Sequence, residues 1–425
     1  SGDATGLEIT SAGALDLGGG RYASLAADTS ATGAAIKQSG ALAIGVLAAL
    51  KAGAGDITLT RADNALAGIA IDGAGVASLV STGAYVVNAS TVSTRLELGG
   101  AGAIGLVGPL SGTGELVMSG SGSLTVSTAQ SYAGGTRINS GRLVLQGPTA
   151  QAGSGAVQLG AAGELDLRDG ASLTNALLAQ GGSVLNTSGS GSLAGPVTLQ
   201  ATTSFLPGAG GLTISGAIGD GGAGFGLRLA GGGTLTLSGS NSFSGTTDIA
   251  AGTLRATGAG ALSSTSAVQL AGGSVLALGQ DQTAGSLSGA GRVELASFTL
   301  ATGADGRDTS FSGSIQGSGG LTKLGSGRFT LAGSGTQTGA THVAAGELVL
   351  ASSNALNEVT AVSVDAGATL TVQQSVSLGS LSGAGTVDLQ APRLAVGSNG
   401  SSTRWSGAIT GSGGLAKRGS GVFTL

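Results

Sequence analysis

Apolar and polar residues alternate in short runs along much of the chain, and a glycine precedes most of these runs. Alternation with a period of two is typical of a β-strand with one buried face, and glycine supplies the positive φ that a sharp corner needs. The pattern therefore predicts short strands joined by tight corners. The clearest runs are Gly233-Thr-Leu-Thr-Leu237, Gly252-Thr-Leu254, Gly273-Ser-Val-Leu-Ala-Leu278, Gly291-Arg-Val-Glu-Leu295 and Gly327-Arg-Phe-Thr-Leu331.

The glycines that begin these runs recur at a nearly constant spacing. Successive gaps between the five are 19, 21, 18 and 36 residues, and the last gap is twice the one before it. The spacing returns in a second copy, because residues 238–331 align without a gap with residues 332–425 at an offset of 94. Repeats of this size indicate stacked units, each of which buries its apolar face against a neighbour. The sequence predicts an all-β solenoid with about 19 residues per coil, forming a single elongated rod.

Composition restricts the partners of this solenoid. The 425 residues carry a net charge of −4, with 9% charged residues, 85 glycines, 5 prolines and no cysteine. Since no basic run or interleaving of arginine with aromatic residues occurs, nucleic acid is not an expected partner. The lack of cysteine fits export through an oxidising periplasm. The longest apolar run, residues 41–50, is too short to span a bilayer, and we expect a buried strand pair there.

Paired carboxylates are the first candidates for catalysis, since many β-helices are polysaccharide lyases or glycosidases. Glu164 and Asp166 are the nearest pair, two residues apart on one predicted strand and therefore on the same face. Glu294 and Asp388 occupy equivalent positions of the two copies. Residues that recur with a repeat are expected to be solvated strand positions, so we do not expect an enzyme.

The single histidine and two glycine-rich turns are the remaining candidates for chemistry. His342 aligns with Asp248 of the preceding copy, which indicates a variable outward position instead of a catalytic triad member. The run 221–225 resembles the calcium-binding nonapeptide but lacks its aspartate. The acidic turn 303–308 could hold a cation weakly, yet its counterpart 397–402 has no carboxylate. We expect no metal, cofactor or small-molecule substrate.

Aromatic residues are the candidates for adhesive contacts, because such side chains anchor many interfaces. Phe311 and Trp405 occupy the same position of the two copies, so packing at a coil corner is the favoured interpretation. Phe243 and Tyr132 are the other two large aromatics considered as anchors. A repeat of 94 residues is also the size of an immunoglobulin-like adhesin domain. Such domains need bulky cores and turns every 8–12 residues, which the 19-residue subperiod does not supply.

Two segments resemble the autotransporter-associated β-strand repeat, which is also called the passenger-associated transport repeat. The family pattern has a glycine-rich lead, a Leu-Thr-Leu-like strand, an Asn-x-Tyr/Phe-x-Gly-x-Thr turn and a Gly-Thr-Leu strand. It is met at residues 230–254 and, with Tyr132 and Gly135-Thr136, at residues 119–145. The match is weaker at 332–350, where Gln337-Thr-Gly-Ala-Thr341 replaces the aromatic turn.

The resemblance implies a right-handed parallel β-helix that is part of the passenger of a type V secreted protein of Gram-negative bacteria. It implies a structural stalk at the bacterial cell surface, exported through periplasm and outer membrane, whose repeats promote secretion coupled to folding. Its implied partners are the protein's own C-terminal β-barrel, which lies outside this chain, the outer-membrane assembly machinery, and a host or neighbouring-cell surface ligand. The alternatives are an adhesin-like filament and, less favoured, a polysaccharide-active β-helix enzyme.

These patterns divide the chain into four segments. We expect degenerate coils at 1–110, coils with the first transport-type repeat at 111–237, and repeat units at 238–331 and 332–425. No signal peptide precedes the first residue and the last motif stops at Leu425, so we expect a piece of a longer protein. The residues expected to form the repeat motif are Leu235, Leu237, Phe243, Gly245, Thr246, Gly252, Leu254, Gly327, Phe329, Leu331, Gly346, Leu348, Gly421, Phe423 and Leu425.

Overall fold

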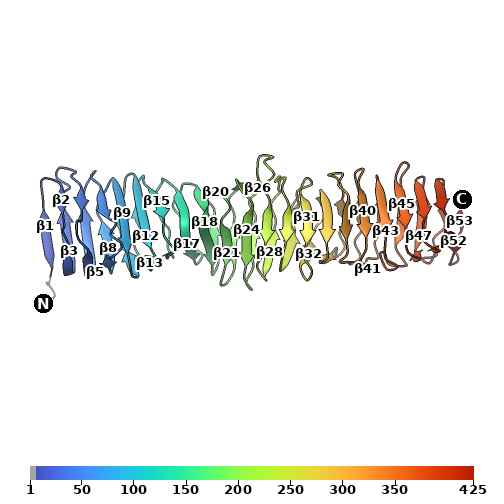
Figure 1. Ribbon diagram of the computed structural model, residues 1–425, viewed down its shortest axis with the longest axis horizontal. Helices are drawn as coiled ribbons and strands as arrows, with labels where there is room; N and C mark the ends of the chain where they lie inside the picture. Colours follow the sequence, from blue (N-terminus) through green and yellow to red (C-terminus); the bar gives the residue numbers. More distant parts are fainter. Residues whose placement is uncertain (1–5) are drawn as a thin grey trace. The chain divides into compact units, whose positions relative to one another are not determined.

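The computed structural model describes residues 6–425, which form β-strands joined by turns, with no helix among them. The chain divides into two compact units, Ser1–Leu212 and Thr213–Leu425. Within each unit every coil lays its strands beside those of the previous coil, as the successive arrows of Figure 1 show. Each unit is therefore a parallel β-solenoid.

The first unit, drawn from blue to green in Figure 1, consists of short strands and a few longer, bent ones. Its strands are β1 (Leu7–Thr10), β2 (Leu15–Asp16), β3 (Gly20–Asp28), β4 (Ile36–Lys37), β5 (Leu42–Lys51), β6 (Ile57–Leu59), β7 (Ala65–Leu66), β8 (Gly68–Ile71), β9 (Val76–Ser81), β10 (Tyr85–Val87), β11 (Ser90–Thr91), β12 (Arg95–Gly100), β13 (Ala103–Leu106), β14 (Leu110–Ser111), β15 (Glu115–Met118), β16 (Ser123–Val126), β17 (Thr136–Gln146), β18 (Val157–Arg168), β19 (Ala171–Leu173), β20 (Leu177–Ala179), β21 (Ser183–Asn186), β22 (Gly191–Leu193), β23 (Val197–Leu199) and β24 (Thr203–Pro207).

The second unit, drawn from green to red, has shorter and more regular strands. They are β26 (Ile218–Gly219), β27 (Leu227–Leu229), β28 (Thr234–Leu237), β29 (Thr247–Ile249), β30 (Thr253–Ala256), β31 (Ala267–Leu270), β32 (Val275–Leu278), β33 (Gln282–Ala284), β34 (Ser286–Gly289), β35 (Arg292–Glu294), β36 (Leu300–Thr302), β37 (Thr309–Phe311), β38 (Ser314–Gln316), β39 (Leu321–Lys323), β40 (Arg328–Leu331), β41 (Ser334–Gly335), β42 (Thr341–Val343), β43 (Glu347–Leu350), β44 (Ala361–Val364), β45 (Thr369–Val372), β46 (Val376–Leu378), β47 (Ser380–Gly383), β48 (Thr386–Leu389), β49 (Arg393–Val396), β50 (Thr403–Arg404), β51 (Ala408–Gly411), β52 (Gly414–Lys417) and β53 (Phe423–Thr424), after β25 (Leu212–Ile214), which begins at the last residue of the first unit.

The register between coils matches the spacing read from the glycines. In the first unit Ser123 of β16 pairs in parallel with Arg142 of β17, 19 residues later. In the second unit the residues at the start of β30, β32 and β35 pair in turn, and the intervals are 22 and 17 residues. The predicted all-β parallel β-helix is confirmed, with roughly 20 residues per coil instead of about 19.

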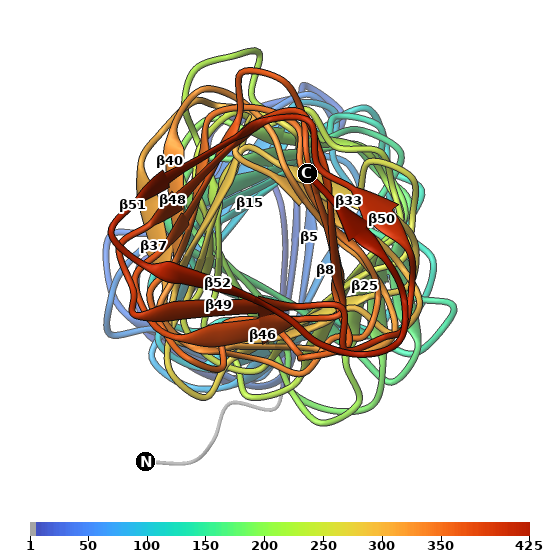
Figure 2. The same cartoon turned by 90° about the vertical axis from the view of Figure 1, so that its right-hand side faces the viewer.

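The core consists of columns of apolar side chains, one from each coil. In the first unit Leu124, Leu143 and Leu165 stand in register and are fully buried. In the second unit Leu254 and Leu276 do the same. Three sides enclose each core, and Figure 2 shows them for the last coils of the second unit, formed by β48 with β51, β49 with β52, and β50 with β53. Burying one such side chain contributes about 1.5–3 kcal/mol before chain entropy is subtracted.

The apolar run at 41–50 is one bent strand, β5, and not the buried strand pair that the sequence predicts. Its first half pairs with β7 through Ile44 and its second half pairs with β8 through Ala48. The two halves meet at a bend where Val46 is 68% exposed. The alternation of buried and exposed positions continues on each side of the bend, because an irregularity in the register absorbs one extra residue of β5.

Candidate functional site

The strands of the repeat motif place their expected residues inward. Leu235 and Leu237 of β28 are fully buried, and Leu235 pairs in register with the buried Leu254 of β30. Thr234 and Thr236, which alternate with these leucines, face outward and are partly exposed. The alternation read from the sequence therefore gives the correct face for each residue of this strand.

The second copy of the motif keeps the same arrangement in β40 and β43. Phe329 and Leu331 are buried, and Phe329 lies in register with the buried Leu348. Their equivalents one repeat later are Phe423, which is half-buried on β53, and Leu425, which is 74% exposed. β53 pairs with β50.

The turn between β28 and β29 begins with an asparagine that joins three coils. The side-chain oxygen of Asn241 accepts a hydrogen bond from the backbone N–H of Ile218 at 2.9 Å. Its side-chain nitrogen donates to the carbonyl of Ala261 at 2.7 Å. Because Ile218 belongs to the preceding coil and Ala261 to the following one, the amide satisfies buried backbone groups on both sides.

The aromatic residue of this turn, Phe243, is fully buried. The predicted motif threonine, Thr246, is exposed, whereas its neighbour Thr247 points inward and shares a 2.9 Å hydrogen bond with Ser266 of the next coil. Gly245 has no positive φ, but a Cβ on it would lie 2.3 Å from the carbonyl carbon of Phe225. The glycine is needed because the neighbouring backbone approaches so closely.

The other two turns of this type differ at the same positions. In the first unit Tyr132 replaces the phenylalanine, and its hydroxyl lies 2.5 Å from the hydroxyl oxygen of the buried Thr136. In the second copy Gln337 stands at the position of Phe243 and is fully buried. Both polar atoms of the Gln337 side chain and the hydroxyl oxygen of Thr341 have no hydrogen-bond partner in the described structure. Of the three turns, this one alone leaves a buried side-chain amide without a hydrogen-bond partner.

The motif glycines serve two different purposes. Gly252 and Gly346 have positive φ, 71° and 65°, as predicted for corners. Gly327 and Gly421 do not, so the expectation of positive φ is wrong for these two. A Cβ at either position would instead come within 2.5 Å of a carbonyl oxygen of the preceding coil. Close stacking, and not backbone handedness, excludes other residues there.

The glycine-rich loop 221–225 has an aspartate that the sequence comparison missed, because it precedes the glycines. The carboxylate of Asp220 accepts hydrogen bonds from the N–H groups of Gly222, Gly224 and Phe225 at 2.8–3.0 Å and from the hydroxyl of Ser244 at 2.8 Å. Burial raises the pKa of Asp220, but these hydrogen bonds outweigh burial and lower the pKa to about 2. The carboxylate shapes this projecting loop, visible after β26 in Figure 1.

The carboxylate pair Glu164 and Asp166 lies on one strand, β18, as predicted, but Asp166 is not solvated. Its side chain is fully buried, and Oδ2 accepts hydrogen bonds from Arg168 at 2.8 Å and from the hydroxyl of Thr187 at 2.7 Å. Arg142 pairs with Glu164 at 2.7 Å and covers the same face. Each carboxylate is neutralised by a guanidinium, so the pair forms a structural ion network without a free acid and base.

The remaining acidic candidates and the histidine lie at outward positions, as the sequence indicates. Glu294 pairs with Arg292 at 2.8 Å, and Asp388 accepts a hydrogen bond from Gln390 at 2.7 Å. Nε2 of His342 lies 3.0 Å from Oδ2 of Asp365, and both side chains are partly exposed. Within residues 6–425 no group of three potential metal ligands converges.

The four large aromatics considered as adhesive anchors are all in the core. Tyr132, Phe243, Phe311 and Trp405 are each at most 1% exposed. Phe311 and Trp405 occupy equivalent positions, and both lie beside a Gly that ends a strand of the preceding coil, Gly289 and Gly383. Packing at a coil corner is therefore their role.

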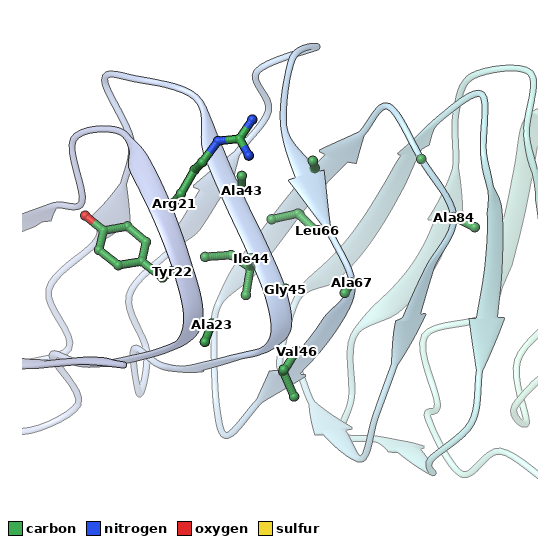
Figure 3. A pocket seen from close by; sticks show the side chains of 12 residues that line it. Arg21, Tyr22, Ala23, Ala43, Ile44, Gly45, Val46, Leu66, Ala67 and Ala84 are labelled. Atoms are coloured by element: carbon green, nitrogen blue, oxygen red, sulfur yellow. The ribbon is translucent and has the colours of Figure 1, made fainter. Parts of the chain in front are cut away.

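A shallow hollow of about 480 Å³ lies on the outer face of the first unit, where three coils meet around β3, β5 and β7. Figure 3 shows Arg21 and Tyr22 at one side, Val46 at another, and small side chains such as Ala43 and Ala67 between them. The lining is mostly apolar, and no cluster of catalytic groups faces it.

Among residues 6–425 no helix is long and apolar enough to cross a membrane.

The aromatic-type turns described above lie in segments that match a known family. The family model of the passenger-associated-transport-repeat matches residues 112–145, 227–256 and 321–350, which include the turns of Tyr132, Phe243 and Gln337. The chain carries the passenger-associated-transport-repeat of autotransporter passengers in these three segments. The matches coincide with the segments that the sequence pattern indicated.

The N-terminal coils of the chain match a different family. Residues 4–71 match a family described as repeats of unknown function. No curated protein and no solved structure matches the chain. The family of its later repeats implies secretion to the cell surface.

Proposed function

We propose that this chain is a non-catalytic, structural passenger segment that forms a stalk on the surface of a Gram-negative bacterium and promotes its own export by folding. The observation that carries the proposal is the hydrogen bonding of each coil to the coils about 20 residues before and after it, as at Asn241. A chain with such contacts can fold one coil at a time as it emerges from a pore.

The energetic argument follows from the inward leucines. When β28 docks, Leu235 and Leu237 leave water together, and each contributes about 1.5–3 kcal/mol before chain entropy is subtracted. Re-entry into the pore would require this burial to be reversed. Docking outside the membrane therefore opposes backward movement of the chain. The proposed partners are the pore through which the passenger leaves and the outer-membrane assembly machinery.

The test is the surface yield of a double variant, Leu235→Asp with Leu237→Asp. Its matched control is Thr234→Asp with Thr236→Asp, which places the same charges on the outward face of the same strand. We expect the inward variant to reach the surface poorly and the outward variant to match the wild type. Wild-type display of an inward variant whose coil is cleaved by added protease would refute the proposal.

A second candidate function, adhesion, is favoured by the apolar hollow of the first unit. Val46 borders it and is 68% exposed, so it adds accessible apolar surface to the apolar lining of the hollow. Val46→Glu should then weaken attachment of displayed cells to a host or bacterial surface without changing display. Unchanged attachment would contradict an adhesive role of the hollow and would favour the structural stalk.

A further inference from the structure

The turn 397–402 contains the only Asn-Gly pair of the chain, Asn399-Gly400, and both residues are exposed. An asparagine followed by glycine is prone to deamidation. The backbone nitrogen of the next residue attacks the side-chain carbonyl carbon, and glycine has no side chain that hinders its approach. Gly400 has a φ of 75°, so the turn itself favours glycine at this position. The nucleophile and the amide that it attacks are therefore adjacent in an exposed turn.

The first copy shows that an aspartate fits this turn. Asp305 is the residue equivalent to Asn399, and the glycine after Asp305 has a φ of 72°. The Asp305 carboxylate accepts hydrogen bonds from the N–H of Arg307 at 3.1 Å and from the hydroxyl of Ser286 at 2.7 Å. The acidic turn that the sequence suggested as a weak cation site thus holds this carboxylate with donors of the chain itself.

The Asn399 side chain makes the same two contacts in the second copy. Its Oδ1 accepts a hydrogen bond from the N–H of Ser401 at 3.0 Å, and its Nδ2 lies 3.3 Å from Oγ of Ser380. Ser380, the first residue of β47, is equivalent to Ser286 and is buried. The polar groups on both sides of the amide are therefore the same in the two copies.

These two contacts lie where a deamidation reaction needs them. When the Gly400 nitrogen attacks Cγ of Asn399, negative charge develops on Oδ1, and a backbone N–H that points at this oxygen stabilises the charge. The N–H of Ser401 has this position. When the Cγ–Nδ2 bond breaks, the leaving nitrogen takes up a proton, and the hydroxyl of Ser380 beside Nδ2 is placed to supply it.

The turn also has room to change shape. A Cβ on Gly400 would meet only Oγ of Ser420, at 3.6 Å, so no backbone of another coil presses on this residue. The N–H of Gly400 donates to the carbonyl of Gly397 at 3.2 Å, and this hydrogen bond must open before the nitrogen attacks. The reaction therefore requires a local opening of the turn and not the unfolding of a coil.

We propose that Asn399 is a site of self-catalysed deamidation, which gives the turn of the second copy the carboxylate that the first copy has in Asp305. A bond forms between the Gly400 nitrogen and Cγ of Asn399, the Cγ–Nδ2 bond breaks, and ammonia leaves with the proton from Ser380. The Gly400 nitrogen gives its own proton to water, and water reprotonates Ser380. A water molecule then opens the cyclic imide and leaves a carboxylate. This modification does not depend on the route of export.

Incubation of the purified full chain at neutral pH, followed by mass spectrometry of its peptides, tests the proposal. Asn139 is also exposed but precedes a serine, so it serves as the reference within the same chain. We expect Asn399 to be converted about tenfold faster than Asn139. Asn399→Gln should remove the mass change from the peptide of this turn. Conversion of Asn399 no faster than that of Asn139 would overturn the proposal.

A second set of measurements separates catalysis by the folded turn from the reactivity of any Asn-Gly pair. Ser380→Ala should slow conversion of Asn399 about tenfold, and Ser380→Thr, which restores a hydroxyl, should recover most of the rate. Ser286→Ala, the matched change in the first copy, should leave the rate unchanged. An unchanged rate in Ser380→Ala would overturn the role of Ser380 as proton donor.

A third comparison needs no variant. In concentrated urea the contacts of Asn399 with Ser380 and Ser401 are lost, so the wild-type chain should be converted more slowly there than when it is folded. Equal or faster conversion of Asn399 in urea would show that the folded turn does not promote the reaction.

Discussion

Gln337 offers the sharpest test of how the aromatic turn contributes to stability. It occupies the position that Phe243 holds one repeat earlier, and it is fully buried with no partner for either polar atom. We expect Gln337→Met to stabilise the second unit, because methionine keeps the length of the side chain and removes the two unpaired atoms. The reciprocal change, Phe243→Gln, should destabilise it.

The magnitudes follow from these environments. A buried polar group without a partner costs about 1–3 kcal/mol, so Gln337→Met should raise the free energy of unfolding by about that amount. Gln337→Phe should gain less, since a Cβ on Gly335 would already lie 2.6 Å from Oε1 of Gln337 and the space is tight. Phe243→Gln should lose about 3 kcal/mol or more, because it removes a buried ring and adds an unpaired amide.

Urea unfolding followed by circular dichroism, together with hydrogen exchange to locate the change, measures these effects. The exchange of Thr341–Val343 should slow in Gln337→Met, while that of Thr247–Ile249 stays as in the wild type. A methionine variant that is less stable than the wild type would refute the reasoning, because it would mean that the amide of Gln337 is well satisfied.

Three further predictions test the corners and ion networks. The pKa of Asp220 is lowered from 3.8 to about 2, so its contribution to stability is present above about pH 4 and lost as the pH falls through about 2. The free energy of unfolding of Asp220→Asn should therefore change less steeply with pH in this range than that of the wild type. Asp166→Asn should lower the free energy of unfolding by about 1–3 kcal/mol, because it leaves Arg168 without its buried partner; an unchanged urea midpoint would contradict the network. Gly245→Ala should destabilise the protein by about 1–3 kcal/mol, because the new Cβ would lie 2.3 Å from the carbonyl carbon of Phe225. Gly232→Ala, with open space around it, should be nearly neutral by the same assay.

In the repeats the sequence was sufficient to predict the inward faces of strands such as β28 and the approximate coil length, because alternation and glycine spacing depend on local geometry. It was insufficient where a side chain's environment comes from another coil. Asp166 has the outward position that its strand predicts, yet Arg168 and Thr187 cover it. Gly245 and Gly327 are required by backbone in the preceding coil, which no local pattern reveals.

Lys323 could have been found from sequence, because it takes an inward position in Leu321-Thr-Lys323 and recurs as Lys417. In the structure Lys323 is fully buried, whereas Lys417 in the last coils is exposed. The partners of Lys323 could not be predicted, since they are backbone carbonyls of its own corner and of the following coil.

The central claim, that docking of successive coils promotes export, is tested most directly by the export rate of a graded series at one inward position. The variants Leu237→Val, Leu237→Ala and Leu237→Asp progressively reduce the burial of β28, and pulse-chase labelling with external protease measures how fast each chain reaches the surface. The account predicts that the logarithm of the export rate falls in step with the free energy of unfolding. A constant export rate across variants whose stability falls would contradict it.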